Sequence, residues 1–371
     1  MRHHLFFWFI LLVTFAAVWS FADYKSPAVT DAAQAEKDLR QFNDWLYTFG
    51  APPSNGAIAR TVARAKANPD DVRWLFWAGQ WGVEGRVHDS DWVNGLRRAT
   101  EKEYPPAMAL YGTVLCGVSE RPASDVAGGL ELIRRAAAKD DPLAMYQLAL
   151  AYSAGLPGVP ANLERAEALA HRAVDHGMLR SLFVLSKLYQ ARGDGQKAQQ
   201  YLARAIDAGD PKAIIMSAQS YMFGSSPDFA KAVDLMRRGA LLGDRRCMTE
   251  FATALEMQLG GQKRDAVLEQ RLLRRAISLG DRNAEAEWAL GQVNGSYGIG
   301  VDKPTGLAKL QRLAGAGVPG AEMDLGGLLL KGKHVKQDEQ AGIALVRQAA
   351  RHGNPMAKLV LEKRGLAEKQ R

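Results

Sequence analysis

The chain has 371 residues, of which 47% are hydrophobic and 24% are charged, and its formal net charge at pH 7 is +8. This composition is ordinary for a folded protein, and it excludes disorder along the whole length. A modest basic excess does not by itself indicate a nucleic-acid partner. The two cysteines, Cys116 and Cys247, are too few for a scaffold held together by disulfides.

The first 22 residues predict an export signal rather than part of the fold. A short basic start precedes an apolar run over residues 5–19, and small residues occupy the −3 and −1 positions of a cleavage site before Asp23. We expect the mature chain to begin at Asp23. An uncleaved membrane anchor is the alternative, although residues 5–21 are short against the roughly 20 residues that a bilayer requires.

A nine-residue pattern, A-x-x-x-G-x-P-x-A, recurs through the rest of the chain. Its clearest copies are Ala205-Ile-Asp-Ala-Gly209-Asp-Pro211-Lys-Ala213 and Ala349-Ala-Arg-His-Gly353-Asn-Pro355-Met-Ala357. Weaker copies start at Ala63, Ala99, Ala136, Ala173, Gly239, Ala276 and Leu313, which gives nine starts at intervals of 32 to 37 residues. A fixed period of this length indicates an array of structural repeats.

Each repeat predicts two helices. In one unit, small and apolar residues recur at steps of three and four from Ala144 to Tyr152, which is typical of one buried helical stripe that ends at Gly155. Asn162 is a plausible N-cap for the second helix, which runs on to Gly177. The pattern predicts seven helix pairs between about residues 71 and 352.

This unit resembles the Sel1-like repeat, a relative of the tetratricopeptide repeat with a longer loop. The loop and second helix match in Gly298-Ile-Gly300-Val301-Asp302 and in Gly332-Lys-His-Val335-Lys-Gln-Asp338-Glu-Gln-Ala341. The resemblance covers about residues 63–357. It implies an all-α fold, a right-handed superhelical solenoid of stacked antiparallel helix pairs.

The predicted domain organisation follows from this register. Residues 1–22 form the signal peptide or anchor, and residues 23–70 form N-terminal helices that cap the solenoid, at roughly 31–48 and 56–67. Residues 71–371 form the repeat array, with a capping helix from Pro355. Terminal units of such an array need a polar outer side.

No enzyme signature appears in the sequence. The motifs H-E-x-x-H, C-x-x-C and G-x-S-x-G are absent. Residues 327–334 approach a phosphate-binding loop, but His334 replaces the required Ser or Thr and the repeat explains the glycines. We therefore predict a protein that is not an enzyme, with no catalytic residues, no metal and no other cofactor.

An aromatic face is the first candidate for a binding site. Trp74, Trp77 and Trp81 share one side of a predicted helix, and alignment with later units places them on the inner side of the superhelix. They form either a platform for a sugar ring or a partner's apolar side chain, or a buried cluster covered by the helix near residues 31–49.

A stripe along the inner side of the first helices is the second candidate. It combines apolar residues with a few polar ones: Tyr146, Leu150, Phe183, Lys187, Ile215, Gln219, Glu250, Glu287 and Met323. Exposed apolar residues in a groove suit the capture of a partner's helix or extended segment. The alternative is that superhelical curvature buries these side chains between adjacent units.

A ladder of arginines near the end of the second helices is the third candidate. Its members recur once per unit: Arg98, Arg135, Arg172, Arg204, Arg238 and Arg275. Anionic lipid headgroups or an acidic protein surface would suit such a ladder. The alternative is a solvated face with local ion pairs to residues such as Asp175, Asp207 or Glu250.

Together these features predict a non-enzymatic scaffold of the bacterial cell envelope that binds a protein partner through its groove. We expect a periplasmic location, or an inner-membrane anchor facing the periplasm, with the membrane surface nearby and no nucleic acid. The resemblance adds two specific roles: immunity against a secreted, phospholipase-type toxin, and binding or export of envelope polysaccharide through the tryptophan face.

Overall fold

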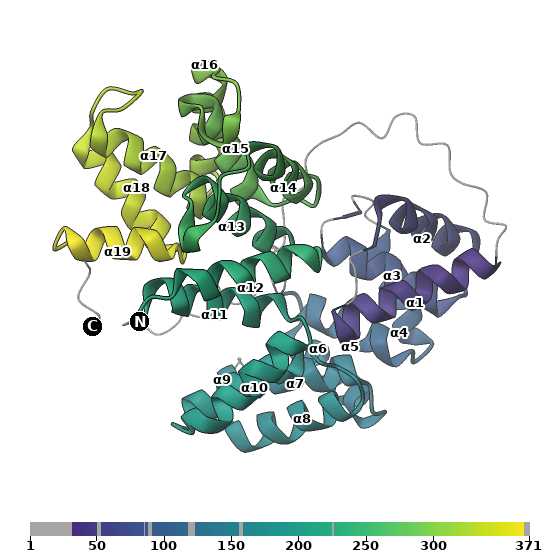
Figure 1. Ribbon diagram of the computed structural model, residues 1–371. Helices are drawn as coiled ribbons and strands as arrows, with labels where there is room; N and C mark the ends of the chain where they lie inside the picture. Colours follow the sequence, from purple (N-terminus) through teal and green to yellow (C-terminus); the bar gives the residue numbers. More distant parts are fainter. Residues whose placement is uncertain are drawn as a thin grey trace. The chain divides into compact units, whose positions relative to one another are not determined.

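The computed structural model describes residues 32–49, 53–84, 86–87, 91–117, 123–155, 159–224 and 226–366. The predicted signal peptide lies outside these residues. Within them the secondary structure is helical, with no β-strand, as the sequence predicts (Figure 1).

The helices follow one another in pairs after two N-terminal helices. The N-terminal helices are α1 (Ala32–Thr48) and α2 (Asn55–Ala67). The pairs are α3 (Val72–Val83) with α4 (Trp92–Glu101), α5 (Pro105–Leu115) with α6 (Val126–Ala138), α7 (Pro142–Ala154) with α8 (Leu163–Asp175), α9 (Ser181–Ala191) with α10 (Gly195–Asp207), α11 (Pro211–Phe223) with α12 (Phe229–Leu241), α13 (Arg245–Glu256) with α14 (Ala266–Ser278), α15 (Arg282–Asn294) with α16 (Lys303–Gly315), and α17 (Pro319–Lys331) with α18 (Glu339–Arg351). The closing helix is α19 (Pro355–Lys363), and the short 3₁₀ helices η1 (Leu259–Gly261) and η2 (Ser296–Gly298) lie in two of the loops.

The predicted count of seven pairs is one too few. Nine copies of the repeat pattern each join a second helix to the following first helix, so they enclose eight complete pairs. The helices of a pair pack on each other, and first helices pack on first helices of the next pair, as in α5 on α7 and α15 on α17. The all-α arrangement of stacked helix pairs is thereby confirmed.

The chain divides into two compact units, the first ending at Ala213 and the second beginning at Ile214. This boundary falls inside α11, and the sequence pattern does not mark it. Each unit has its own buried core, so the two are described separately below.

The repeat pattern is explained by the turn that joins consecutive pairs. Its fifth position adopts a positive φ, for example +88° at Gly243 and +82° at Gly280, which glycine tolerates without steric cost. The next position carries an N-cap: the Asp244 carboxylate accepts a hydrogen bond of 2.8 Å from the Cys247 amide. The turn therefore ends one helix and starts the next with three residues between them, as from α12 to α13 and from α14 to α15.

Candidate functional site

In the first unit, α1 crosses the face formed by the first helices of successive pairs. The Phe42 ring lies 5.1 Å from Trp77 and 5.2 Å from Trp81, both on α3. At the C-terminal end of α1, the Tyr47 carbonyl accepts a 2.9 Å hydrogen bond from the amide of Leu179, which lies just before α9 begins. The helix thus reaches from the first pair to the fourth.

Charged groups hold α1 in place at Asp38, in its first half, and at its C-terminal end. The Asp38 carboxylate is 1% exposed and accepts hydrogen bonds from Arg60 and Arg64 of α2, with N–O distances of 2.6 and 2.8 Å. Burial acts to raise the pKa of Asp38, but these hydrogen bonds outweigh it and lower the pKa below its ordinary value. The Arg180 guanidinium donates to the carbonyls of Leu46 and Trp45 at 2.7 and 3.0 Å, at the negative end of the helix dipole.

The three predicted tryptophans are brought together but are not exposed. Trp74, Trp77 and Trp81 are 4%, 2% and 0% exposed. Trp77 and Trp81 pack beneath α1 against Phe42 and Trp45, whereas the Arg64 guanidinium of α2 lies 4.8 Å from the centre of the Trp74 ring. Of the two predicted arrangements, the buried cluster is the one that the structure contains. A sugar-binding platform at this place would need an open aromatic face, and burial removes it.

The predicted inner stripe is half-buried in both units. Tyr146, Leu150, Phe183 and Lys187 of the first unit keep part of their surface accessible, as do Gln219, Glu250, Glu287 and Met323 of the second, while Ile215 is buried. The stripe is therefore neither fully exposed nor fully enclosed between repeats. Its character differs between the units, because carboxyl groups gather on it only in the second.

Three carboxyl groups occupy one repeat position on successive first helices of the second unit. Glu250 on α13, Glu287 on α15 and Asp324 on α17 are each 37 residues apart, and all three are half-buried. We call them the acidic row. Glu250 and Glu287 belong to the predicted inner stripe, whereas Asp324 was not predicted, although the spacing of 37 residues points to it.

The α15–α16 loop places a tyrosine among these acids. The Tyr297 hydroxyl donates a 2.5 Å hydrogen bond to Glu287 Oε2 and lies 3.3 Å from the Thr253 hydroxyl. The Tyr297 amide donates to Glu256 Oε2 at 2.8 Å, and Glu256 pairs with Arg264 at 2.5 Å. Asp324 Oδ2 is shielded from solvent and forms no hydrogen bond with any described residue.

The surroundings of the acidic row favour its protonated form. Burial raises the pKa of Glu287 to about 7 despite the hydrogen bond from Tyr297, and the charges of Glu250 and Asp281 act in the same direction as burial. Burial also raises the pKa of Asp324, and the charge of Glu287 adds to this effect. A cation placed here would favour the ionised carboxylates, so its binding would release protons.

The arginine ladder is tied to neighbouring repeats in the first unit. Arg135 pairs with Glu103 at 2.7 Å and Arg172 with Asp140 at 2.6 Å, so the partners of these two arginines are acids of the preceding turn. Glu103 and Asp140 hold the fifth position of the turn, with φ of 55° and 60°, where later repeats have glycine.

The other ladder members have varied surroundings. The Arg98 guanidinium donates to the Pro69 carbonyl at 2.6 Å, and the Arg204 guanidinium lies 5.2 Å from the Tyr201 ring centre. Arg238 is half-buried and Arg275 is exposed. Exposed ion pairs of the kind seen in the first unit contribute little stability each, so the ladder acts mainly as a solvated edge there.

Metal-binding clusters and membrane-spanning helices are both absent from the described residues. They contain no group of three or more His, Cys, Asp or Glu side chains arranged to hold a metal ion. Among the helices of the described part, none combines the length and the hydropathy that crossing a membrane requires.

The fold and the repeated turn define the class of protein as a helical-repeat array. The family model of the Sel1 repeat matches residues 142–178, 188–210, 211–244 and 319–354. The chain therefore contains Sel1 repeats at four places, which confirms the resemblance seen in the sequence. A comparison with curated proteins found no match.

Solved structures of similar fold include Sel1-repeat proteins. The chain is 19% identical to c5321, a protective antigen of uropathogenic Escherichia coli, with coverage of 85% of this chain and 68% of that one and a TM-score of 0.44. A Sel1 repeat protein from Oxalobacter formigenes is 21% identical, with coverage of 92% and 96% and a TM-score of 0.41. The immunity protein Pa5087 from Pseudomonas aeruginosa is 17% identical, with coverage of 62% and 84% and a TM-score of 0.42.

Proposed function

We propose that this protein is a non-catalytic scaffold of the bacterial cell envelope whose second unit holds a basic helical segment of a partner protein. The segment lies on the inner face of α13, α15 and α17, against the acidic row. One observation carries the proposal: in the first unit, the face made by the first helices already holds a helix, α1, through aromatic, carboxylate and carbonyl contacts.

The inner faces of the two units differ in charge, and this difference indicates what kind of partner segment the second unit binds. Where α1 meets the first unit, the anchors are Phe42 on tryptophan rings and Asp38 on arginines. The second unit presents three half-buried carboxyl groups on its inner face. Lysine or arginine side chains of a partner would supply the missing positive charge, and charge complementarity sets the specificity and the association rate of such contacts.

The test is crosslinking in intact cells with the full chain, including its N-terminal segment, followed by mass spectrometry. The triple variant E250Q/E287Q/D324N keeps side-chain shape and removes the acids. We expect it to capture the partner at least tenfold less well than the wild type, and we expect crosslinks from α13–α17 to fall on a lysine- and arginine-rich segment.

A matched control neutralises three exposed acids elsewhere, as E131Q/D175N/E362Q. Capture by the control should equal that of the wild type. Equal losses in both variants, or crosslinks confined to the first unit, would contradict the proposal. Binding should also strengthen between pH 6 and pH 8, because Glu287, whose pKa is raised to about 7, ionises over this range.

Neutralisation of a secreted toxin is a specific form that this scaffold function can take. Co-expression of the full chain with a toxin encoded beside it should then restore growth, and E250Q/E287Q/D324N should abolish the rescue. Absence of rescue by the wild type would remove the toxin role while leaving the scaffold proposal to the crosslinking test.

A further inference from the structure

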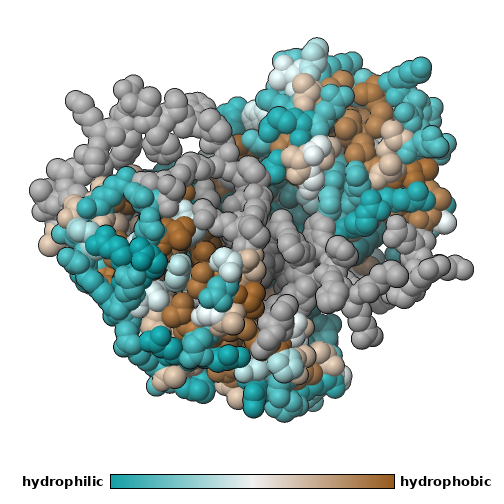
Figure 2. Space-filling view, turned by 180° about the vertical axis from the view of Figure 1, so that it is seen from behind, coloured by the Kyte–Doolittle hydropathy of each residue, from teal (hydrophilic) through white to brown (hydrophobic). Residues whose placement is uncertain are grey.

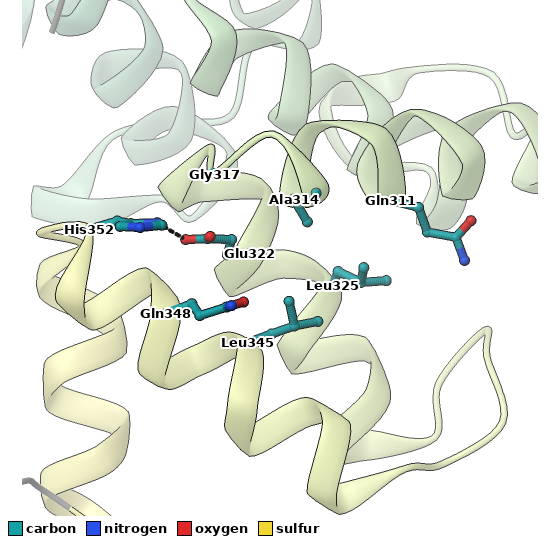
Figure 3. A pocket seen from close by; sticks show the side chains of 9 residues that line it. Gln311, Ala314, Gly317, Glu322, Leu325, Leu345, Gln348 and His352 are labelled. Atoms are coloured by element: carbon teal, nitrogen blue, oxygen red, sulfur yellow. Dashed lines mark hydrogen bonds and ion pairs between the residues drawn. The ribbon is translucent and has the colours of Figure 1, made fainter. Parts of the chain in front are cut away.

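A cavity of about 350 Å³ lies between α16, α17 and α18, among residues that the proposed inner-face function does not use (Figure 3). Glu322 and Leu325 line it from α17, Leu345 and Gln348 from α18, and Gln311 from α16. His352, directly after α18, completes the lining. The cavity thus lies where two second helices flank one first helix.

A buried carboxyl group paired with an imidazole lies in this cavity. Glu322 is 1% exposed, and its Oε2 atom lies 2.7 Å from Nδ1 of His352 (Figure 3). When Glu322 is ionised it only accepts hydrogen bonds, and Nδ1 of His352 is then the donor. Burial raises the pKa of Glu322, and the hydrogen bond from His352 opposes this rise.

The repeat register shows that the fold does not need a charge at this position. Glu322 is the ninth residue after the start of its repeat pattern, and the same position carries methionine in three other repeats, at Met108, Met145 and Met248. These methionines are 0%, 0% and 7% exposed, so an unbranched apolar side chain fills the place well. A buried carboxyl group, even a hydrogen-bonded one, is rarely more stabilising than such packing.

The remaining lining gives the cavity an amphipathic character. Leu325 and Leu345 supply aliphatic surface, and the exposed amides of Gln311 and Gln348 lie at its opening. Gly317 has no side chain beside His352; a Cβ atom there would come within 3.5 Å of the imidazole. An elongated ligand with an apolar stem and a hydrogen-bond-donating, positively charged end matches these groups.

We propose that this cavity binds a primary ammonium group on an unbranched aliphatic stem, with Glu322 as its counter-charge and Leu325 and Leu345 against the stem. A lysine side chain of a bound protein and a free alkyl diamine share this chemistry. The site is separate from the acidic row, so it stands whether or not the inner face binds a basic helix.

Methyl NMR of the full chain tests the proposal through the signals of Leu325 and Leu345. The probes are Nα-acetyl-lysine methylamide, its norleucine analogue without the ammonium group, and 1,5-diaminopentane. We expect saturable shifts with the lysine amide or the diamine, and at least tenfold weaker binding of the norleucine compound. Tighter binding of the lysine amide than of the diamine identifies a protein as the source of the ligand, and the reverse identifies a free amine.

Two variants at the same repeat position separate the site from the general surface charge. E322M restores the methionine of other repeats and should weaken binding of the ammonium probes at least tenfold, and E322Q provides a second folded variant. E285M changes the preceding repeat, where Glu285 lies 3.4 Å from Arg312, and should leave binding unchanged. Equal binding of the norleucine compound, unchanged binding by E322M and E322Q, or equal losses in E285M would overturn the proposal.

Discussion

The first helices of the two units have the same repeat geometry but different surroundings. In the first unit α1 covers them, and large aromatic side chains such as Trp77 and Trp81 fill the contact. In the second unit the acidic row remains half-buried. The second unit also carries the large apolar side chains that are exposed in the described residues, such as Met257 and Val267. Figure 2 shows apolar areas at the surface among hydrophilic ones.

This difference shows how a repeat array separates stability from binding. Repeat positions that face the neighbouring unit are restricted to small and apolar residues, because each unit buries its core only against its neighbours. The inner-face positions are free of this restriction. The first unit uses them to hold α1, and the second keeps ionisable groups there that lower its stability.

The largest effect should come from removing the centre of the α1 contact. Phe42→Ala should lower the free energy of unfolding of the first unit by about 3–5 kcal/mol, because a fully buried ring is lost and a cavity remains. Denaturant unfolding followed by tryptophan fluorescence measures this change. Asn43→Ala, at an exposed position of the same helix, should have little effect; equal losses in the two variants would show that α1 is not docked through Phe42.

Loss of Arg180, which donates hydrogen bonds to the carbonyls at the C-terminal end of α1, should have the next largest effect. Arg180→Met keeps the apolar stem and removes the hydrogen bonds to the Leu46 and Trp45 carbonyls. We expect a loss of about 1.5–3 kcal/mol, since hydrogen bonds to charged groups are worth about this much. Hydrogen exchange should rise near residue 46 in this variant and stay at the wild-type rate in Arg134→Met, at an exposed arginine.

The acidic row should make the stability of the second unit depend on pH. The pKa of Glu287 is about 7 in the folded chain against an ordinary value of 4.5, so the folded state holds a proton that the unfolded state has lost. The free energy of unfolding should therefore fall as the pH rises from about 4.5 to about 7.

Glu287→Gln removes the carboxyl group that takes up this proton. It should raise the free energy of unfolding at pH 8 by about 1–2 kcal/mol. Thermal unfolding followed by circular dichroism from pH 5 to pH 8 measures the change. Glu362→Gln, at an exposed residue of α19, should keep the slope of the wild type. An unchanged slope in Glu287→Gln would show that this carboxyl group does not take up a proton on folding.

The smallest effects should come from the turns. Glu103→Gly relieves the cost of a positive φ but removes the exposed pairs with Arg135 and Lys139, so the two effects oppose each other and we expect little net change in the free energy of unfolding. Gly280→Ala in the second unit has no such compensation and should lose about 1 kcal/mol. Chemical denaturation measures both. Comparable losses in the two variants would show that the ion pairs of Glu103 outweigh its backbone strain.

The sequence predicts the helical fold well because the turn is local: a glycine or carboxylate with positive φ, an Asp cap and a proline recur at a fixed period. The contact of α1 could not be located in this way, since Arg180 and Leu46 are 134 residues apart and no short motif connects them. The acidic row was only partly predictable from the sequence. Its period of 37 residues is visible there. The burial that raises the pKa of Glu287, and the hydrogen bond from Tyr297 that opposes this rise, arise only in the folded chain.

The hydrogen bonds of Arg180 also constrain the order of folding. An array whose units touch only their neighbours can fold from any point and spread in either direction. Here the carbonyls at the end of α1 meet their donor only after more than a hundred further residues have been made. The C-terminal end of α1 is therefore synthesised early and meets this partner late, so this contact, unlike those of α1 with α2 and α3, carries a high loop-closure cost.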